Sequence, residues 1–264
     1  MMSHTTAAFF DLDKTIIATS SSTAFGRSFY ADGLLTRTDA LRTAYARLMF
    51  ELGGADERRT NRLRDALSEL VRGWDVERVN EIVAQTLHEH IDPVVYQEAL
   101  ALMRRHQANG RDVVIVSASS AEMVGPIARL LGADHWIASQ LEVEDGVYTG
   151  NVTYYAYGQA KADAIVDLAR ERGYNLGASY AYSDSVTDAP MLNVVGHGFA
   201  VNPNLAMRRA AMDNGWGMLS FRTPVALRTS RRVVPAVAVA LTITAAVVAG
   251  IVVYRSLRGE REDA

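Results

Sequence analysis

The chain has 264 residues, of which 49% are apolar, and a formal net charge of −3. This length holds one large domain or two smaller ones, and the apolar fraction is ordinary for a globular protein with a sizeable core. The small negative charge gives no reason to expect nucleic acid as a partner, and the absence of cysteine excludes disulfides, thiol catalysis and thiolate metal sites.

The first predicted element is a short strand at 7–10, which reads AAFF and runs directly into DLDKT. An unbroken apolar run of this kind is typical of a parallel strand that is covered on both faces. Two carboxylates, Asp11 and Asp13, lie at its end with one residue between them. One carboxylate in such a pair can attack phosphorus as a nucleophile, and the other can act as general acid and base.

About 100 residues separate the first predicted strand from the second, and about 70 of them, 20–92, show no obvious strand. A simple strand–helix–strand unit takes about 30 residues, so this segment is a surplus. Its apolar spacing predicts four helices, at 21–33, 37–54, 57–74 and 75–91. We therefore expect a small all-helical cap domain at 20–92, inserted into the larger domain.

The rest of the chain alternates strands with helices. We expect strands at 112–119, 179–185 and within 196–204, helices at 120–133 and 158–173, and a hairpin at 140–152 that turns at Asp145 and Gly146. This order predicts a doubly wound, Rossmann-like α/β core with a parallel sheet, formed by residues 1–19 and 93–222.

An apolar segment lies near the C-terminus. Residues 233–254 include no charged side chain, and arginines stand on both sides. A bilayer core requires about 20 apolar residues in a helix, so the segment predicts a transmembrane helix with a short polar tail, 255–264. A buried core helix is the alternative. Because no signal-peptide pattern precedes it, we expect a single-pass membrane protein with residues 1 to about 230 in the cytoplasm.

Polar residues follow three of the predicted strands. Asp11, Ser117 and Asp184 should converge on one crevice, because ligands bind at the carboxyl ends of such strands. Lys161 lies near the start of a helix between the second and third of these strands, and Lys14 is the one other lysine among 27 basic residues. Carboxylate and hydroxyl oxygens with a single ammonium suit Mg²⁺ and a phosphate group.

Four motifs in this order resemble those of the haloacid dehalogenase superfamily of phosphohydrolases: FFDLDKT, VVIVSAS, GQAKADA and YSDSVTDAPML. The position of the helical insertion is similar to the cap of its subfamily IB, the phosphoserine-phosphatase-like branch. The resemblance implies that Asp11 is the nucleophile and Asp13 the acid and base. It implies that phosphate is bound by Thr15, Ser117, Ala118 and Lys161. It further implies Mg²⁺ as cofactor, held by Asp11, the backbone carbonyl of Asp13 and Asp184, with Asp188 supporting the metal's shell.

The predicted activity is a Mg²⁺-dependent phosphomonoesterase that works through an aspartyl-phosphate on a small or amphiphilic phosphomonoester. True phosphoserine phosphatases carry a glutamate where this chain has Ser20 and usually an asparagine where it has Thr187. A neutral serine cannot pair with a substrate ammonium group, so we expect a substrate other than phosphoserine. The alternatives are a phosphotransferase to an alcohol and a catalytically idle, membrane-tethered phosphate-binding protein.

Overall fold

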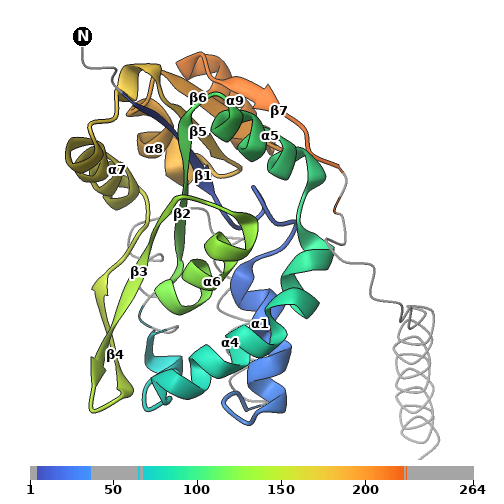
Figure 1. The fold of residues 1–264 in the computed structure, drawn as a ribbon, viewed down its shortest axis with the longest axis vertical. Helices are drawn as coiled ribbons and strands as arrows, with labels where there is room; N and C mark the ends of the chain where they lie inside the picture. Colours follow the sequence, from blue (N-terminus) through green and yellow to red (C-terminus); the bar gives the residue numbers. More distant parts are fainter. Residues whose placement is uncertain (1–4, 37–64, 66–67, 223, 225–264) are drawn as a thin grey trace, which may run out of the picture. The chain divides into compact units, whose positions relative to one another are not determined.

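A computed structural model describes residues 5–36, 65, 68–222 and 224 of the chain (Figure 1). The strands of its sheet are β1 (Thr6–Asp11), β2 (Arg111–Ser120), β3 (His135–Glu144), β4 (Val147–Tyr154), β5 (Tyr180–Ser183), β6 (His197–Val201) and β7 (Gly217–Leu219). The α-helices are α1 (Ser21–Ala31), α4 (Val76–Ile91), α5 (Gln97–Ala108), α6 (Ala121–Leu131), α7 (Gln159–Arg172), α8 (Ala189–Asn193) and α9 (Leu205–Asn214). Short 3₁₀ turns occupy Asp92–Val94, Leu176–Ala178 and Val186–Asp188.

The strands form one sheet in the order β4-β3-β2-β1-β5-β6-β7. Neighbouring strands run parallel, except that β3 and β4 pair antiparallel as an edge hairpin. The hairpin turns at Asp145 and Gly146, whose φ angles of 50° and 81° are both left-handed, as a tight hairpin turn requires. The parallel α/β core agrees with the sequence prediction, and so does the position of this turn.

Both faces of the central strand β1 are covered, which explains its unbroken apolar sequence. Ala8 and Phe10 point into a hydrophobic cluster with α5 and α6, whereas Ala7 and Phe9 point into a second cluster with α7, α8 and α9. All four side chains are fully buried. Alternate residues of a strand point to opposite faces, so β1 lies in the middle layer of three.

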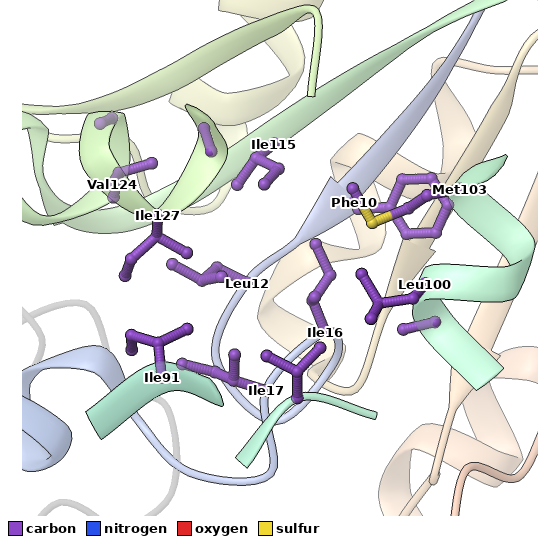
Figure 2. Close-up of a cluster of buried hydrophobic side chains, with 14 of the residues drawn as sticks. Phe10, Leu12, Ile16, Ile17, Ile91, Leu100, Met103, Ile115, Val124 and Ile127 are labelled. Atoms are coloured by element: carbon purple, nitrogen blue, oxygen red, sulfur yellow. The ribbon is translucent and has the colours of Figure 1, made fainter. Parts of the chain in front are cut away.

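The loop after β1 is anchored by its own apolar residues (Figure 2). Leu12, Ile16 and Ile17 are fully buried in the first cluster, where Figure 2 shows them among side chains that include Ile127 of α6 and Ile91 of α4. The amides of Ile16 and Ile17 both donate to the carbonyl of Leu12, at 2.9 and 3.1 Å. Burial on one side and a tight turn therefore fix the backbone that bears the two aspartates.

The described part of the predicted cap consists chiefly of α1 and α4, which pack together beyond the carboxyl end of β1 (Figure 1). Phe25 and Phe29 of α1 and Val79 and Val83 of α4 belong to the same buried cluster as Ile16. The helix predicted at 37–54 lies outside the described residues, and the one predicted at 57–74 is described only in part. The boundaries of a cap at 20–92 therefore stay a prediction.

Some of the described elements were not predicted from the sequence. They include the helices α5 and α9, the edge strand β7, and the first half of β3, which pairs in parallel with β2. The last two have a physical reason. β7 has only three residues, and β3 begins with the half-exposed His135 and the exposed Trp136, so neither shows a clear alternation of apolar and polar residues.

The C-terminal part of the predicted fold needs correction. In the described part of the chain, no helix is both long enough and apolar enough to cross a bilayer. The longest helix described there, α4, has 16 residues and an amphipathic sequence, whereas a span takes about 20 apolar residues. The proposed span itself, 233–254, lies outside the described residues. The transmembrane helix, the membrane as a partner and the single-pass location are therefore withdrawn.

Candidate active site

The polar residues at the strand ends lie along one edge of the sheet. Asp11 is the last residue of β1 and lies beside Val116 of β2 in the parallel register. Ser117 follows Val116, and Asp184 directly follows β5, which pairs with β1 on its other side. Because β2, β1 and β5 are adjacent and parallel, their carboxyl ends bring these residues to one place.

Lys161 joins this edge from α7, which begins after Gly158. Its Nζ donates to Oδ1 of Asp11 at 2.7 Å and to Oδ2 of Asp188 at 2.8 Å. The three side chains are buried, with exposed fractions of 2% for Lys161, 7% for Asp11 and 3% for Asp188. A buried lysine between two carboxylates is an ion cluster, and removal of the lysine would leave both carboxylates unpaired.

The charges of this cluster do not balance. Burial by itself would lower the pKa of Lys161, but the carboxylates of Asp11 and Asp188 reverse the effect and raise it. Burial raises the pKa of Asp11 well above its ordinary value; Lys161 opposes this rise, whereas Asp188 and Asp184 add to it. One buried ammonium group thus faces three neighbouring carboxyl groups, and the buried groups carry an excess of negative charge when all three carboxyls are ionised.

Thr15 links the loop after β1 to the loop after β5. Its hydroxyl donates to Oδ2 of Asp11 at 3.3 Å and accepts from the Asp184 amide at 3.0 Å. Burial raises the pKa of Asp184 to about 6, with Lys14 lowering it and Asp188 raising it. The hydroxyl of Ser183 donates to Oδ2 of Asp188 at 2.7 Å. These bonds hold the backbone of Asp184 and the carboxylate of Asp188 at this edge.

Ser117 and Ala118 lie at the carboxyl end of β2, as predicted. The Ser117 side chain is 1% exposed, and its hydroxyl accepts from the Ser119 amide at 3.2 Å. The Ala118 carbonyl accepts from the hydroxyl of Ser139 at 2.7 Å, and Ser139 in turn accepts from the Ala156 amide at 3.1 Å. Among the described residues, the hydrogen bond that the Ser117 hydroxyl accepts comes from another residue of β2. It does not link Ser117 to the ion cluster of Lys161, Asp11 and Asp188.

Asp13 points elsewhere. Its Oδ1 accepts from the Ser21 amide at 2.8 Å, and its Oδ2 accepts from the Ser119 hydroxyl at 3.4 Å. Burial raises the pKa of Asp13, and the bonds from Ser21 oppose this rise. The second aspartate of the motif is therefore held between the start of α1 and the end of β2, whereas Asp11 is held by Lys161 and Thr15.

A divalent cation suits the donors at this edge. Asp11 and Asp184 are close enough that the charge of Asp184 raises the pKa of Asp11, and a cation between them would relieve that repulsion. Among the described residues, no group of three or more His, Asp or Glu side chains is arranged so that it could hold a metal ion by itself. A cation here would complete its shell with backbone, water or phosphate oxygens, which is the kind of binding typical of Mg²⁺.

The two positions that depart from the phosphoserine-phosphatase pattern have local partners. Ser20 is 8% exposed and caps α1: its hydroxyl accepts from the Thr23 amide at 3.3 Å and lies 2.6 Å from the Thr23 hydroxyl. The Thr187 hydroxyl lies 2.8 Å from that of Ser185. Both side chains thus make local hydrogen bonds at the ends of short segments.

The sequence analysis did not single out Ser21, Ser119 or Ser183, which hydrogen-bond to Asp13 or Asp188. A signal was present for two of them, which stand beside a predicted site residue: Ser183 precedes Asp184, and Ser119 follows Ala118. Hydroxyl-rich runs at strand ends can serve as turns or as ligands, and only the fold shows which carboxylate each hydroxyl contacts.

Comparisons with known proteins identify a family that includes this chain. The family model of the haloacid dehalogenase-like hydrolases matches residues 8–193. A protein of Streptomyces azureus named for inhibition of morphological differentiation is 54% identical over 96% of this chain and 94% of its own length. A probable phosphatase of Mycobacterium tuberculosis is 51% identical over 96% of this chain and 89% of its own length.

A solved structure described as a phospho-aspartyl intermediate analogue of phosphoserine phosphatase superposes with a TM-score of 0.60. It is 20% identical and covers 84% of this chain and 95% of its own. At this identity the likeness concerns the fold alone.

Proposed function

The chain belongs to the haloacid dehalogenase-like hydrolases, as its motifs predicted, and from that membership we propose that it is a Mg²⁺-dependent phosphomonoesterase. The observation that supports the proposal best is the buried Asp11 carboxylate at the end of β1, bonded to Lys161 and Thr15. The probable phosphatase of Mycobacterium tuberculosis, 51% identical, bears a name that agrees with this activity.

In the proposed reaction, Asp11 is the nucleophile. One of its carboxylate oxygens attacks phosphorus, the ester P–O bond breaks, and an aspartyl-phosphate forms. Asp13 gives its proton to the departing ester oxygen, which leaves as an alcohol. Asp13 then takes a proton from a water molecule that attacks the phosphorus of the aspartyl-phosphate. Inorganic phosphate leaves, the Asp11 carboxylate is restored, and Asp13 is again protonated.

The remaining residues have binding roles in this proposal. Lys161 neutralises the phosphoryl oxygens, and Ser117 with the backbone at Ala118 binds them at the end of β2. Thr15 keeps the loop after β1 in register with that after β5, through its bonds to Asp11 and Asp184. Mg²⁺, held by Asp11, the Asp13 carbonyl and Asp184 with Asp188 in support, would offset the charge of the carboxylates and of the incoming phosphate.

We infer that the substrate is a phosphomonoester other than phosphoserine. The Ser20 hydroxyl bears no charge, and its bonds to Thr23 use it to cap α1. An ammonium group of a substrate would therefore find no carboxylate at this position. A preference for phosphoserine over phosphomonoesters that lack an amino group would contradict this inference.

The test measures phosphate release by the full chain. The panel contains phosphoserine, lysophosphatidate and p-nitrophenyl phosphate, each with Mg²⁺ and with EDTA, beside Asp11→Asn. Asp163→Asn is the matched control, because Asp163 is an exposed carboxylate on the same helix as Lys161. We expect release that depends on Mg²⁺, is lost in Asp11→Asn and persists in Asp163→Asn.

Two outcomes would redirect the proposal. New phosphate esters formed in the presence of added alcohols, at the expense of inorganic phosphate, would indicate a phosphotransferase. No release from any compound by folded protein that binds Mg²⁺ would indicate a phosphate-binding protein without catalysis.

A further inference from the structure

Two serine hydroxyls from distant parts of the chain meet beside Asp13. Ser21 is the first residue of α1 and is fully buried, and Ser119 lies near the end of β2. Their hydroxyl oxygens are 2.6 Å apart, although 98 residues separate them in sequence. The contact joins the start of the helical segment to the edge of the sheet, and Asp13 lies against both residues.

The two hydroxyls and Asp13 form one hydrogen-bonded group. A serine hydroxyl has one hydrogen, and either serine can donate it in the contact between the two hydroxyls. The Ser119 hydroxyl donates to Oδ2 of Asp13 at 3.4 Å, and side-chain hydrogen bonds from both Ser21 and Ser119 oppose the rise of the Asp13 pKa. Oδ1 of Asp13 accepts separately from the Ser21 amide, so each carboxyl oxygen has its own donor.

The Ser21 hydroxyl has no task in capping its helix. Ser20 is the residue that caps α1, since its side chain accepts from the Thr23 amide. A buried hydroxyl costs free energy unless it is hydrogen-bonded, and the partner of Ser21 is Ser119. Ser119 also donates its amide to the Ser117 hydroxyl at 3.2 Å, so it contacts both the proposed acid and the proposed phosphate-binding serine.

We propose that Ser21 and Ser119 are positioning residues that orient the Asp13 carboxyl group for proton transfer to the leaving alcohol. This inference rests on the proposed phosphomonoesterase activity. With Oδ1 held by the Ser21 amide at 2.8 Å, the more loosely bonded Oδ2, at 3.4 Å from Ser119, is the oxygen that exchanges the proton. Loss of either hydroxyl frees the carboxyl group to rotate, and proton transfer suffers while phosphate binding remains.

The experiment compares two substrates of similar size in the full chain. The p-nitrophenolate leaving group departs without a proton, whereas the alkoxide of benzyl phosphate must be protonated as it leaves. The variants are Ser119→Ala and Ser21→Ala, and the quantity is kcat/KM, which reports steps up to departure of the alcohol. General acid catalysis is worth roughly 10²–10⁴-fold, so we expect mispositioning to cost about 10-fold or more on benzyl phosphate and less than about 3-fold on p-nitrophenyl phosphate.

Controls separate positioning from folding. Ser179→Ala removes a buried hydroxyl at the opposite end of the strands, which accepts from the Ala7 amide and donates to the Asn175 carbonyl. This variant should change kcat/KM by the same small factor for both substrates. Ser119→Thr keeps the hydroxyl and should recover the benzyl phosphate activity. If Ser119→Ala does not fold, the nearly isosteric Ser119→Cys, a weak hydrogen-bond donor, should show the same substrate dependence.

Equal losses on both substrates, or no loss on either, would overturn the positioning role. Wild-type protein that hydrolyses neither substrate would overturn the proposed phosphomonoesterase itself, and that result is distinct because it does not involve the variants.

Discussion

Lys161→Met tests the ion cluster on which the proposed mechanism depends. The change replaces an ammonium group, 2.7 Å from Asp11 and 2.8 Å from Asp188, by an apolar side chain of similar length. Both carboxylates stay buried, with 7% and 3% of their surface exposed. Removal of one partner from a buried ion pair costs about 3–5 kcal/mol, because the remaining charge is unpaired. For a domain of this size, about 2–4 °C per kcal/mol gives a melting temperature lower by about 6–20 °C.

The loss of stability in Lys161→Met relative to wild type should depend on pH in a defined direction. Burial already raises the pKa of Asp11, and Lys161 is the group that opposes the rise. Without Lys161 the folded-state pKa of Asp11 increases further above the unfolded value. A carboxyl group of this kind binds more protons in the folded state, so the stability of the variant falls as pH rises. The difference from wild type should therefore be larger at pH 8 than at pH 5.

Urea unfolding of the full chain in EDTA, followed by circular dichroism at both pH values, measures this difference. Arg170→Met is the matched control, because Arg170 is an exposed cation on the same helix as Lys161, and it should cost less than about 1 kcal/mol. Adding Asp188→Asn to Lys161→Met should restore part of the loss, since one unpaired carboxylate is removed. A Lys161→Met protein as stable as Arg170→Met, or a deficit that grows as pH falls, would refute the reasoning.

Three further predictions follow from the same site and fold. Asp11→Asn should abolish Mg²⁺-dependent phosphate release without unfolding the protein, as measured by phosphate assay and circular dichroism; turnover equal to wild type would exclude an aspartyl-phosphate on Asp11. Burial raises the pKa of Asp184 to about 6 from its ordinary value of 3.8. At about 1.4 kcal/mol per pH unit, the free energy of unfolding of the metal-free protein should fall by roughly 3 kcal/mol as pH rises from about 4 to about 6. Because Mg²⁺ requires the ionised carboxylate, it should raise the melting temperature more at pH 7 than at pH 5, and an equal rise would contradict this role. Gly196→Ala should destabilise the fold by about 2 kcal/mol or more in urea unfolding, since a Cβ there would lie 1.8 Å from the Gly177 carbonyl oxygen; an unchanged midpoint would show that the loop can move.

The sequence was sufficient for the features that depend on strand ends. Asp11, Ser117 and Asp184 lie at or just after the carboxyl ends of buried strands, and the parallel pairing of β1 with β2 and β5 brings them to one edge. Lys161 was identifiable because lysine is rare in this chain and because it begins a helix. These inferences require only chain order and strand direction, which local sequence patterns specify well.

Side-chain pairings across long sequence separations could not be predicted. The contact of Ser21 with Ser119 depends on how closely α1 approaches β2, and no local pattern encodes that distance. The membrane helix failed for a related reason. That prediction rested on the apolar composition of 233–254 alone, and composition by itself does not specify a structure.

The site is assembled at a cost in stability, and this cost is informative about its chemistry. Burial raises the pKa of Asp11, Asp13 and Asp184, so their ionised forms oppose folding at neutral pH. Lys161, the buried ammonium of the described site, is bonded to only two carboxylates. A phosphomonoester would add further negative charge to an edge where negative charge is already in excess. A cation shared by these carboxylates would offset the repulsion, so under the proposed function we expect Mg²⁺ and phosphate to favour each other's binding.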